Sequence, residues 1–206
     1  MILQNKEAKS YFYQKKYQKA FELFYSQNDY YGAGLCCLML KKQESARKFW
    51  KRDKSCPACL WGLCVLDFIN LKIPLKLPTF FQTRAFLEVY LNLFIENDLI
   101  EMAQNMVASC DILYQSNPET YKFIGRALFA NGYFDLAIKF CKKSLKLCYA
   151  DPEAFLILSQ CYFLLGNLGE ALDCVNRINA MVQGYYPTIL FEKILREEIE
   201  KKRNEK

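Results

Sequence analysis

The chain has 206 residues, of which 52% are hydrophobic and 24% are charged, and it contains no histidine. This composition excludes a disordered or collagen-like protein, and the length fits one extended domain or two small ones. The absence of histidine excludes Ser-His-Asp and Cys-His catalysis, histidine-ligated zinc and c-type haem attachment. The net charge is +6, and the excess lies in residues 1–54, which hold 12 Lys and Arg against 5 Asp and Glu.

The first thirty residues carry charges throughout and lack the apolar run of a signal peptide. The longest apolar stretch, Ala58 to Leu66, is too short to span a bilayer. We therefore expect a soluble, cytoplasmic protein that has no membrane partner. In that compartment the ten cysteines are expected to be reduced thiols that behave as small buried hydrophobes.

Residues 1–70 predict degenerate helical pairs. The first pair is indicated by apolar residues at helical spacing, which are Tyr11, Tyr17, Ala20 and Phe24. The second is indicated by Gly34, Cys37, Ala46 and Trp50, and the interval from Ala20 to Ala46 shows that this pair is shortened. Gly32-Ala33-Gly34 is half of a dinucleotide-binding fingerprint, but it lies within a helical pattern and therefore indicates close helix packing.

A basic cluster ends the second pair, with seven cations in fourteen residues. These are Lys41, Lys42, Arg47, Lys48, Lys51, Arg52 and Lys54, opposed only by Glu44 and Asp53. Such a face attracts acidic peptides, RNA or a membrane surface. An ordinary solvated helix face is the alternative, because aromatic residues for base stacking are not interleaved in this segment.

Cys56-Pro57-Ala58-Cys59 is a Cys-x-x-Cys motif at the start of a helix predicted over residues 57–70. A helix N-terminus stabilises a thiolate, so this motif is compatible with disulfide exchange. Thioredoxin-like proteins need an apolar strand just upstream, whereas Trp50–Lys54 indicates a charged helix end. Two incidental cysteines at a helix start are therefore the alternative. No metal site or other cofactor is expected, because neither a second cysteine pair nor a histidine follows.

Residues 71–83 predict an irregular insert that contains Pro74 and Pro78. Two prolines four residues apart do not continue a helix and favour extended backbone. Beyond the repeats, residues 183–206 predict a capping helix and a charged tail, with Gly184 as a stop and Pro187 as a start. The side chains expected on its inner face are Leu190, Phe191, Ile194, Leu195 and Ile199.

Residues 84–182 carry an internal repeat with a period of about 34 residues. Its matched positions include Pro118 and Pro152, Tyr121 and Phe155, Gly132 and Gly166, and Ala137 and Ala171. One more step back reaches Leu87, Asp98 and Ala103. Each unit shows two amphipathic patterns separated by a turn, and Asn117-Pro118 and Asp151-Pro152 mark the starts of the second and third units. A fixed period of this length is typical of repeat architectures.

This register resembles the tetratricopeptide repeat (TPR) family, whose helix–turn–helix unit has the same period. The resemblance covers three units over residues 84–182 and persists more loosely in residues 1–70. It implies an all-α, TPR-like helix-turn-helix solenoid of about a dozen helices with a C-terminal capping helix.

The resemblance also implies a concave groove, lined by the first helix of each unit, that binds an extended peptide or a partner helix. By repeat position the groove residues are Val89, Asn92, Ile95, Glu119, Phe123, Arg126, Phe129, Glu153, Ile157, Gln160 and Phe163. Polar heads beside apolar contacts suit peptide recognition. The alternative is that Phe123 and Phe129 pack on the neighbouring unit.

The leading hypothesis is a non-enzymatic scaffold that binds a partner protein or peptide in this groove and needs no cofactor. Two alternatives stay open. One is a nucleic-acid-binding helical repeat protein that uses the basic cluster of residues 41–54, and the other is a dithiol redox protein that uses Cys56 and Cys59. The sequence predicts no particular oligomeric state.

Overall fold

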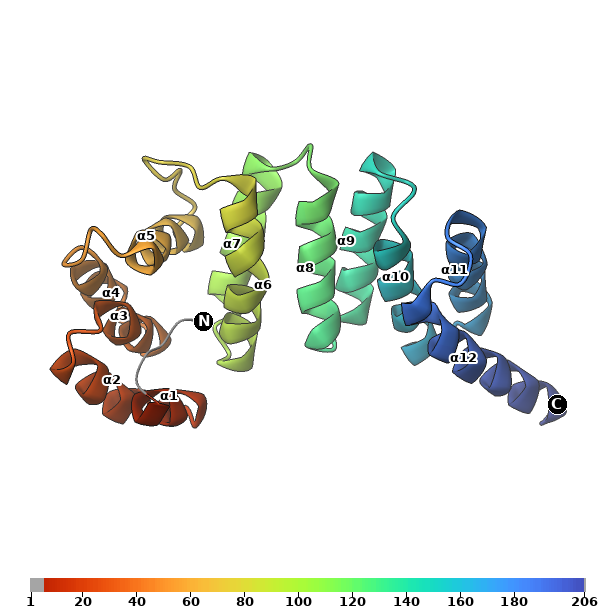
Figure 1. Ribbon diagram of the computed structural model, residues 1–206, viewed down its shortest axis with the longest axis horizontal. Helices are drawn as coiled ribbons and strands as arrows, with labels where there is room; N and C mark the ends of the chain where they lie inside the picture. Colours follow the sequence, from red (N-terminus) through yellow and green to blue (C-terminus); the bar gives the residue numbers. More distant parts are fainter. Residues whose placement is uncertain (1–5, 206) are drawn as a thin grey trace. The chain divides into compact units, whose positions relative to one another are not determined.

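The computed structural model describes residues 6–205, which form twelve α-helices and no strand (Figure 1). The first seven helices are α1 (Lys6–Tyr13), α2 (Tyr17–Ser26), α3 (Tyr30–Met39), α4 (Gln43–Trp50), α5 (Pro57–Ile69), α6 (Phe80–Glu96) and α7 (Ile100–Leu113). The others are α8 (Pro118–Ala130), α9 (Phe134–Leu147), α10 (Pro152–Leu164), α11 (Leu168–Met181) and α12 (Tyr186–Asn204). The predicted all-α class of paired helices is confirmed.

The chain divides into two compact units. Unit 1 consists of Met1–Thr83 and Val89–Ile112, and unit 2 consists of Arg84–Glu88 and Leu113–Lys206. In unit 1, α1 packs on α2 and α3 packs on α4, while in unit 2 the pairs are α8 with α9 and α10 with α11. None of the helices within residues 6–205 is long and apolar enough to cross a membrane.

The turns inside the helix pairs reproduce the sequence register. Each contains one residue in the left-handed region, and Asp98, Gly132 and Gly166 follow one another at one repeat length, with φ of 56°, 80° and 79°. In the shortened N-terminal pairs the equivalent residues are Lys15 and Lys41. Glycine adopts this conformation without the Cβ clash that other residues meet, which explains its presence at two of the five turns.

The helix starts predicted around Asn117-Pro118 and Asp151-Pro152 are confirmed. The Asn117 side chain accepts a hydrogen bond from the Glu119 N–H at 3.0 Å, and Asp151 accepts from the Glu153 N–H at 3.0 Å. Each proline occupies the first turn, where the missing N–H costs no helical hydrogen bond. These caps satisfy backbone donors that a helix start otherwise leaves unpaired.

The core of unit 1 is built around the fully buried indole of Trp50. Its Nε1–H donates to the Tyr31 carbonyl at 3.1 Å. A Cβ atom at Gly34 would lie 2.1 Å from that Nε1, and one at Gly62 would lie 2.5 Å from the same indole. The interpretation of Gly32-Ala33-Gly34 as a site of close helix packing is therefore confirmed. Seven of the ten cysteines are buried as well, which makes most thiols packing residues.

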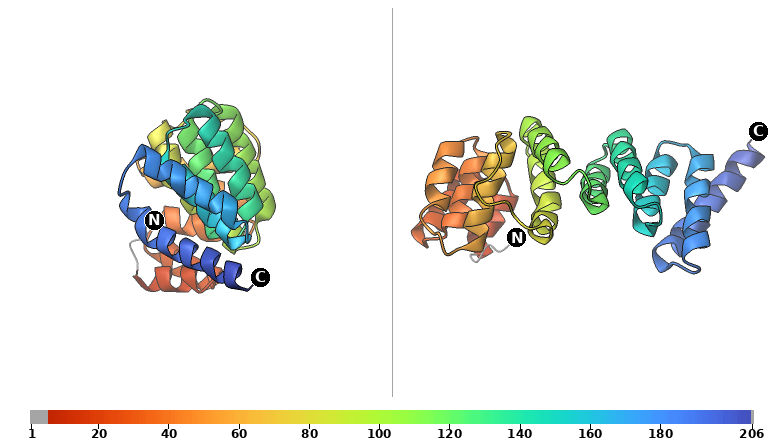
Figure 2. Two further views of the ribbon diagram at one scale, coloured as in Figure 1. Left: turned by 90° about the vertical axis from the view of Figure 1, so that its right-hand side faces the viewer. Right: turned by 90° about the horizontal axis from the view of Figure 1, so that it is seen from above.

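Helix α12, the last helix of unit 2, packs against α11 (Figure 2). Leu195 is fully buried in a core cluster with Ala171 and Val175, and Phe191 and Ile199 pack against it. The expectation that Leu190 and Ile194 also point inward is wrong, since they are 69% and 44% exposed. Residues 191, 195 and 199 form one i, i+4 stripe, and each residue one position earlier is rotated by about 100° away from it.

The predicted insert of residues 71–83 is non-helical up to Thr79, and α6 begins at Phe80. Thr79 and Gln82 form a capping box, in which each side chain bonds the other residue's backbone N–H. Helix α6 thus starts within the last four residues of that segment. Leu71, Ile73, Leu75 and Leu77 of the non-helical part are all more than half exposed.

Candidate functional site: an ionic face on unit 2

A nearly buried lysine on α8 forms ion pairs with three carboxylates of unit 2. The side chain of Lys122 is 7% exposed. Its Nζ lies 2.9 Å from Asp151 Oδ2, 3.0 Å from Glu153 Oε2 and 3.2 Å from Glu119 Oε1. Burial on its own would lower the pKa of Lys122, but hydrogen bonds to Asp151 and Glu153 outweigh it and raise that pKa. Lys122 is therefore a permanent cation at neutral pH.

Arg126, one helical turn further along α8, links carboxylates from two other helices. Its Nε and Nη2 atoms donate to Glu88 Oε2 at 3.0 and 2.5 Å, and its Nη1 donates to Glu153 Oε1 at 2.8 Å. Glu88 belongs to the short part of α6 that lies in unit 2. Such forked contacts fix the planar guanidinium in one orientation.

Phe123 lies between these charges in the α8 sequence and is only 3% exposed. The guanidinium carbons of Arg126 and Arg84 are 4.5 and 4.7 Å from its ring centroid, which is within cation–π range. Arg84 also pairs with Glu119 at 3.1 Å. The ring therefore supports the two arginines and is not itself an open contact surface.

We call the seven charged residues the ionic face: Arg84, Glu88, Glu119, Lys122, Arg126, Asp151 and Glu153. Three cations and four carboxylates give it a net charge of −1. Among its carboxylates, Glu88, Glu119 and Glu153 have side chains that are 28%, 33% and 37% exposed. A ligand can therefore reach their oxygen atoms, whereas Lys122 is enclosed.

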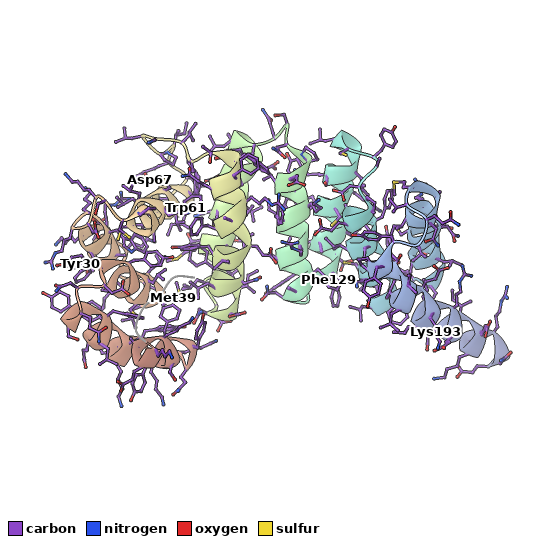
Figure 3. The ribbon with its side chains drawn as sticks, in the orientation of Figure 1. Tyr30, Met39, Trp61, Asp67, Phe129 and Lys193 are labelled. Atoms are coloured by element: carbon purple, nitrogen blue, oxygen red, sulfur yellow. The ribbon has the colours of Figure 1, made fainter. Side chains whose placement is uncertain are left out.

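The structure brings four of the predicted groove residues together on this face, namely Glu119, Phe123, Arg126 and Glu153. The other predicted residues of unit 2 lie elsewhere or are covered. Ile157 is 5% exposed, and Phe163 packs edge-on against Phe191 with ring centroids 5.6 Å apart. Phe129, which is labelled in Figure 3, contacts Phe134 with ring centroids 5.9 Å apart. Gln160 is half-buried on α10. Val89, Asn92 and Ile95 lie on the part of α6 that belongs to unit 1.

Arg84, Glu88, Lys122 and Asp151 were not predicted as members of this face, although the sequence contains a signal for two of the ion pairs. The interval from Lys122 to Glu153 is one helical turn shorter than the repeat, and that from Glu88 to Arg126 is one turn longer. Each pair therefore lies one turn out of register on neighbouring first helices. Opposite charges at such offsets would have predicted the ion pairs.

A hollow of about 630 Å³ lies between α9, α10 and α11, away from the ionic face residues. Its lining includes the apolar residues Leu145, Phe155 and Leu158 and charged residues, among them Lys142 and Arg177. The sequence did not predict this hollow, because the expected groove is lined only by the first helix of each pair, whereas α9 and α11 are second helices. It has the size of ordinary ligand sites in proteins.

The predicted basic cluster of unit 1 is only partly an open cationic surface. Arg47 is half-buried and pairs with Asp67 of α5 at 3.1 Å (Figure 3). The other six members, which are Lys41, Lys42, Lys48, Lys51, Arg52 and Lys54, are exposed.

The two cysteines of the Cys-x-x-Cys motif differ in accessibility. Cys59 is 1% exposed, whereas Cys56 is the half-buried N-cap residue of α5. Burial is the main cause that raises the pKa of the Cys59 thiol, and the neighbouring Cys56 raises it further. Disulfide exchange requires a stabilised thiolate, so the environment of Cys59 opposes that chemistry. Within residues 6–205 there is also no group of three or more Cys, Asp or Glu side chains arranged to hold a metal ion.

The sequence matches no protein-family model and no curated protein. Among solved structures, YrrB, described as a TPR protein with an unusual peptide-binding site, is 13% identical and has a TM-score of 0.46 over 90% of this chain and 88% of that one. The TPR2AB domain of yeast Sti1, in complex with pHSP90, is 9% identical with a TM-score of 0.42, over 92% and 80% of the two chains. A TPR repeat-containing protein from Cytophaga hutchinsonii is 18% identical with a TM-score of 0.46, over 87% and 65%. These neighbours are TPR proteins.

Proposed function

We propose that this chain is a non-catalytic, TPR-like scaffold whose ionic face binds an extended segment of a partner protein. The observation that supports it is the convergence of Glu119, Arg126 and Glu153 from successive first helices onto one partly exposed surface. Side chains fixed in this way lose little conformational entropy when a ligand binds. They therefore suit recognition of a segment that has no fixed structure of its own.

The charge of the ionic face favours a partner segment that carries Lys or Arg. The cation Lys122 is enclosed by three carboxylates, and Arg126 is already paired with Glu88 and Glu153. An acidic segment would have to displace these internal carboxylates. A basic segment would instead meet the exposed oxygens of a surface with net charge −1, so its attraction needs no rearrangement.

A peptide array tests the proposal. Extended peptides of varied charge are probed with the wild-type protein and with Glu153→Gln, which removes one accessible carboxylate and keeps the shape of the side chain. We expect the wild type to select peptides rich in Lys and Arg, and Glu153→Gln to bind them about tenfold more weakly. Phe123→Ala is unsuitable as a test, because truncating a buried ring destabilises the fold itself.

Glu197→Gln is the matched control, since Glu197 is a 63% exposed carboxylate on α12. It should leave peptide selection unchanged. If the wild type selects no basic peptide, or if Glu153→Gln keeps the full affinity, the ionic face is not the binding surface.

A further inference from the structure

Unit 1 carries an aromatic cluster that connects α2 with α4, the second helices of the first two helix pairs. Phe21 and Tyr25 of α2 stack in parallel with ring centroids 5.8 Å apart. Phe49 of α4 meets them edge-on, at 5.4 Å from Phe21 and 5.7 Å from Tyr25. Tyr25 is 46% exposed and the two phenylalanines are half-buried, so the cluster lies at the surface and not in the core.

Arg52 lies over this cluster. Its guanidinium carbon is 5.2 Å from the ring centroid of Phe49, 5.9 Å from that of Tyr25 and 5.7 Å from that of Tyr30, which Figure 3 shows at the edge of unit 1. Hydrogen bonding to Tyr25 raises the pKa of Arg52, which is therefore always a cation. Within residues 6–205 no carboxylate forms an ion pair with Arg52, so its donors are not engaged by an internal anion.

Exposed lysines flank Arg52 on the same helix end. Lys48, Lys51 and Lys54 are exposed, and none forms an ion pair within the part of the chain that the structure describes. The nearest acid in sequence, Asp53, is engaged at the start of α5, where its Oδ1 accepts from the Ser55 hydroxyl at 2.7 Å and from the Cys56 N–H at 3.1 Å.

Two further acids lie on these helices. Glu22 of α2 accepts a hydrogen bond from Gln18 at 3.3 Å. Glu44 lies in the first turn of α4, at the opposite end of the helix from Arg52. Even when Glu22 and Asp53 are counted, the four cations Lys48, Lys51, Arg52 and Lys54 leave a net positive charge around Arg52.

These contacts supply the element that the basic cluster lacks in sequence. Aromatic faces for stacking come from α2, a different helix from the one that Arg52 follows, and only the packing of side chains of α2 on α4 brings them together. Proteins that bind single strands combine cations for the phosphates with aromatic side chains on which bases stack. Cations alone would not favour a single strand, because a duplex carries the higher density of phosphates.

We propose that this surface, which we call the Arg52 surface (Phe21, Tyr25, Tyr30, Phe49, Arg52, Lys48 and Lys51), binds single-stranded nucleic acid. Bases stack on the exposed ring of Tyr25, and phosphates contact Arg52 and the lysines. In a duplex the base faces are already stacked on one another, so only the phosphate contacts remain. The Arg52 surface consists of unit 1 residues only and does not depend on the function proposed for unit 2.

Fluorescence anisotropy tests this proposal with a fluorescein-labelled oligothymidylate of about 12 nucleotides, within the range that one such site covers. We expect saturable binding at about 50 mM salt and at least about tenfold weaker binding of a duplex of equal length. If Lys48, Lys51 and Arg52 neutralise three phosphates, the logarithm of the association constant should fall with the logarithm of salt concentration with a slope of about −2.

Two variants separate stacking from charge. Tyr25→Ala removes a half-exposed ring and should weaken single-strand binding about tenfold while the salt slope stays the same. Lys48→Gln should weaken both single-strand and duplex binding and reduce the slope by about 0.7. Lys193→Gln on α12, with a side chain that is 74% exposed, is the control and should change neither.

The proposal is overturned if the wild type shows no saturable binding of the oligothymidylate. It is also overturned if the duplex binds as tightly as the single strand, or if Tyr25→Ala binds like the wild type, because either result leaves only non-specific charge attraction. A circular dichroism spectrum and a thermal unfolding curve for each variant establish that a loss of binding does not reflect unfolding.

Discussion

Lys122 belongs to the ionic face and also contributes to the stability of unit 2 through its ion pairs. We expect Lys122→Met to lower the free energy of unfolding by about 2–3 kcal/mol, because the enclosed carboxylate of Asp151 then loses its cation. Breaking a fully buried ion pair typically costs about 3–5 kcal/mol. We expect a smaller loss here, because the carboxylates of Glu119 and Glu153 are partly hydrated. Urea unfolding followed by circular dichroism measures the difference.

The control for that prediction is Lys193→Met. Lys193 lies 3.9 Å from Glu197 on the surface of α12, and its removal should change the free energy of unfolding by no more than about 0.5 kcal/mol. Equal effects of the two substitutions would mean that the Lys122 ion pairs do not contribute to stability.

The residues of the ionic face show what repeat position can and cannot predict. Glu119 and Glu153 occupy equivalent positions, so the register placed both on the same face. It left open whether Phe123 packs on the neighbouring unit, and it did not predict that Ile157, one repeat later, is covered; both side chains are buried. Burial depends on which side chains the adjacent helix presents, and the period of the repeat carries no information on that.

At the scale of the element, α12 offers a direct test of helix phase. Leu195 is fully buried against α11, whereas Leu190 is 69% exposed. Leu195→Ala should lower the free energy of unfolding by about 3 kcal/mol, because it leaves a cavity. Leu190→Ala should change that free energy by no more than about 0.5 kcal/mol. Amide hydrogen exchange should show faster exchange along α12 in the first variant only. Similar exchange in both variants would contradict the observed orientation.

Helix existence and helix limits were predictable wherever short-range chemistry determines them. The Asn-Pro and Asp-Pro starts and the turns at Gly132 and Gly166 follow from capping and from left-handed backbone conformation. The phase of α12 was not predictable, because apolar residues occupy two adjacent stripes and only contact with α11 selects one of them. The start of α6 required recognition of the Thr79 capping box.

At the scale of the whole molecule, the composition determines how stability depends on pH. A chain without histidine has no side chain with an unperturbed pKa between pH 5 and 8. Above this range, burial raises the pKa of Cys174 to about 11 and those of Cys110, Cys161 and Tyr31 to about 12. Below it, hydrogen bonds from Asn179 and Arg196 lower the pKa of Glu192. On the alkaline side, folding is thus linked to the ionisation of buried neutral groups.

The sign of this linkage follows from the direction of the shifts. A thiol that ionises near pH 9 when unfolded, and only near pH 11 or 12 when folded, contributes its full stability below pH 9. That contribution is lost as the pH rises through the folded pKa. We therefore expect the free energy of unfolding to change little between about pH 6 and 8. Above about pH 9 each such thiol should remove about 1.4 kcal/mol per pH unit.

Urea unfolding of the reduced protein at a series of pH values measures this slope, and one variant identifies its origin. Cys110→Ala removes a fully buried thiol and should make the decline above pH 9 shallower by about 1.4 kcal/mol per pH unit, the contribution of one proton. If Cys110→Ala kept the wild-type slope, or if stability fell already between pH 6 and 8, the buried thiols would not be the groups that couple folding to pH.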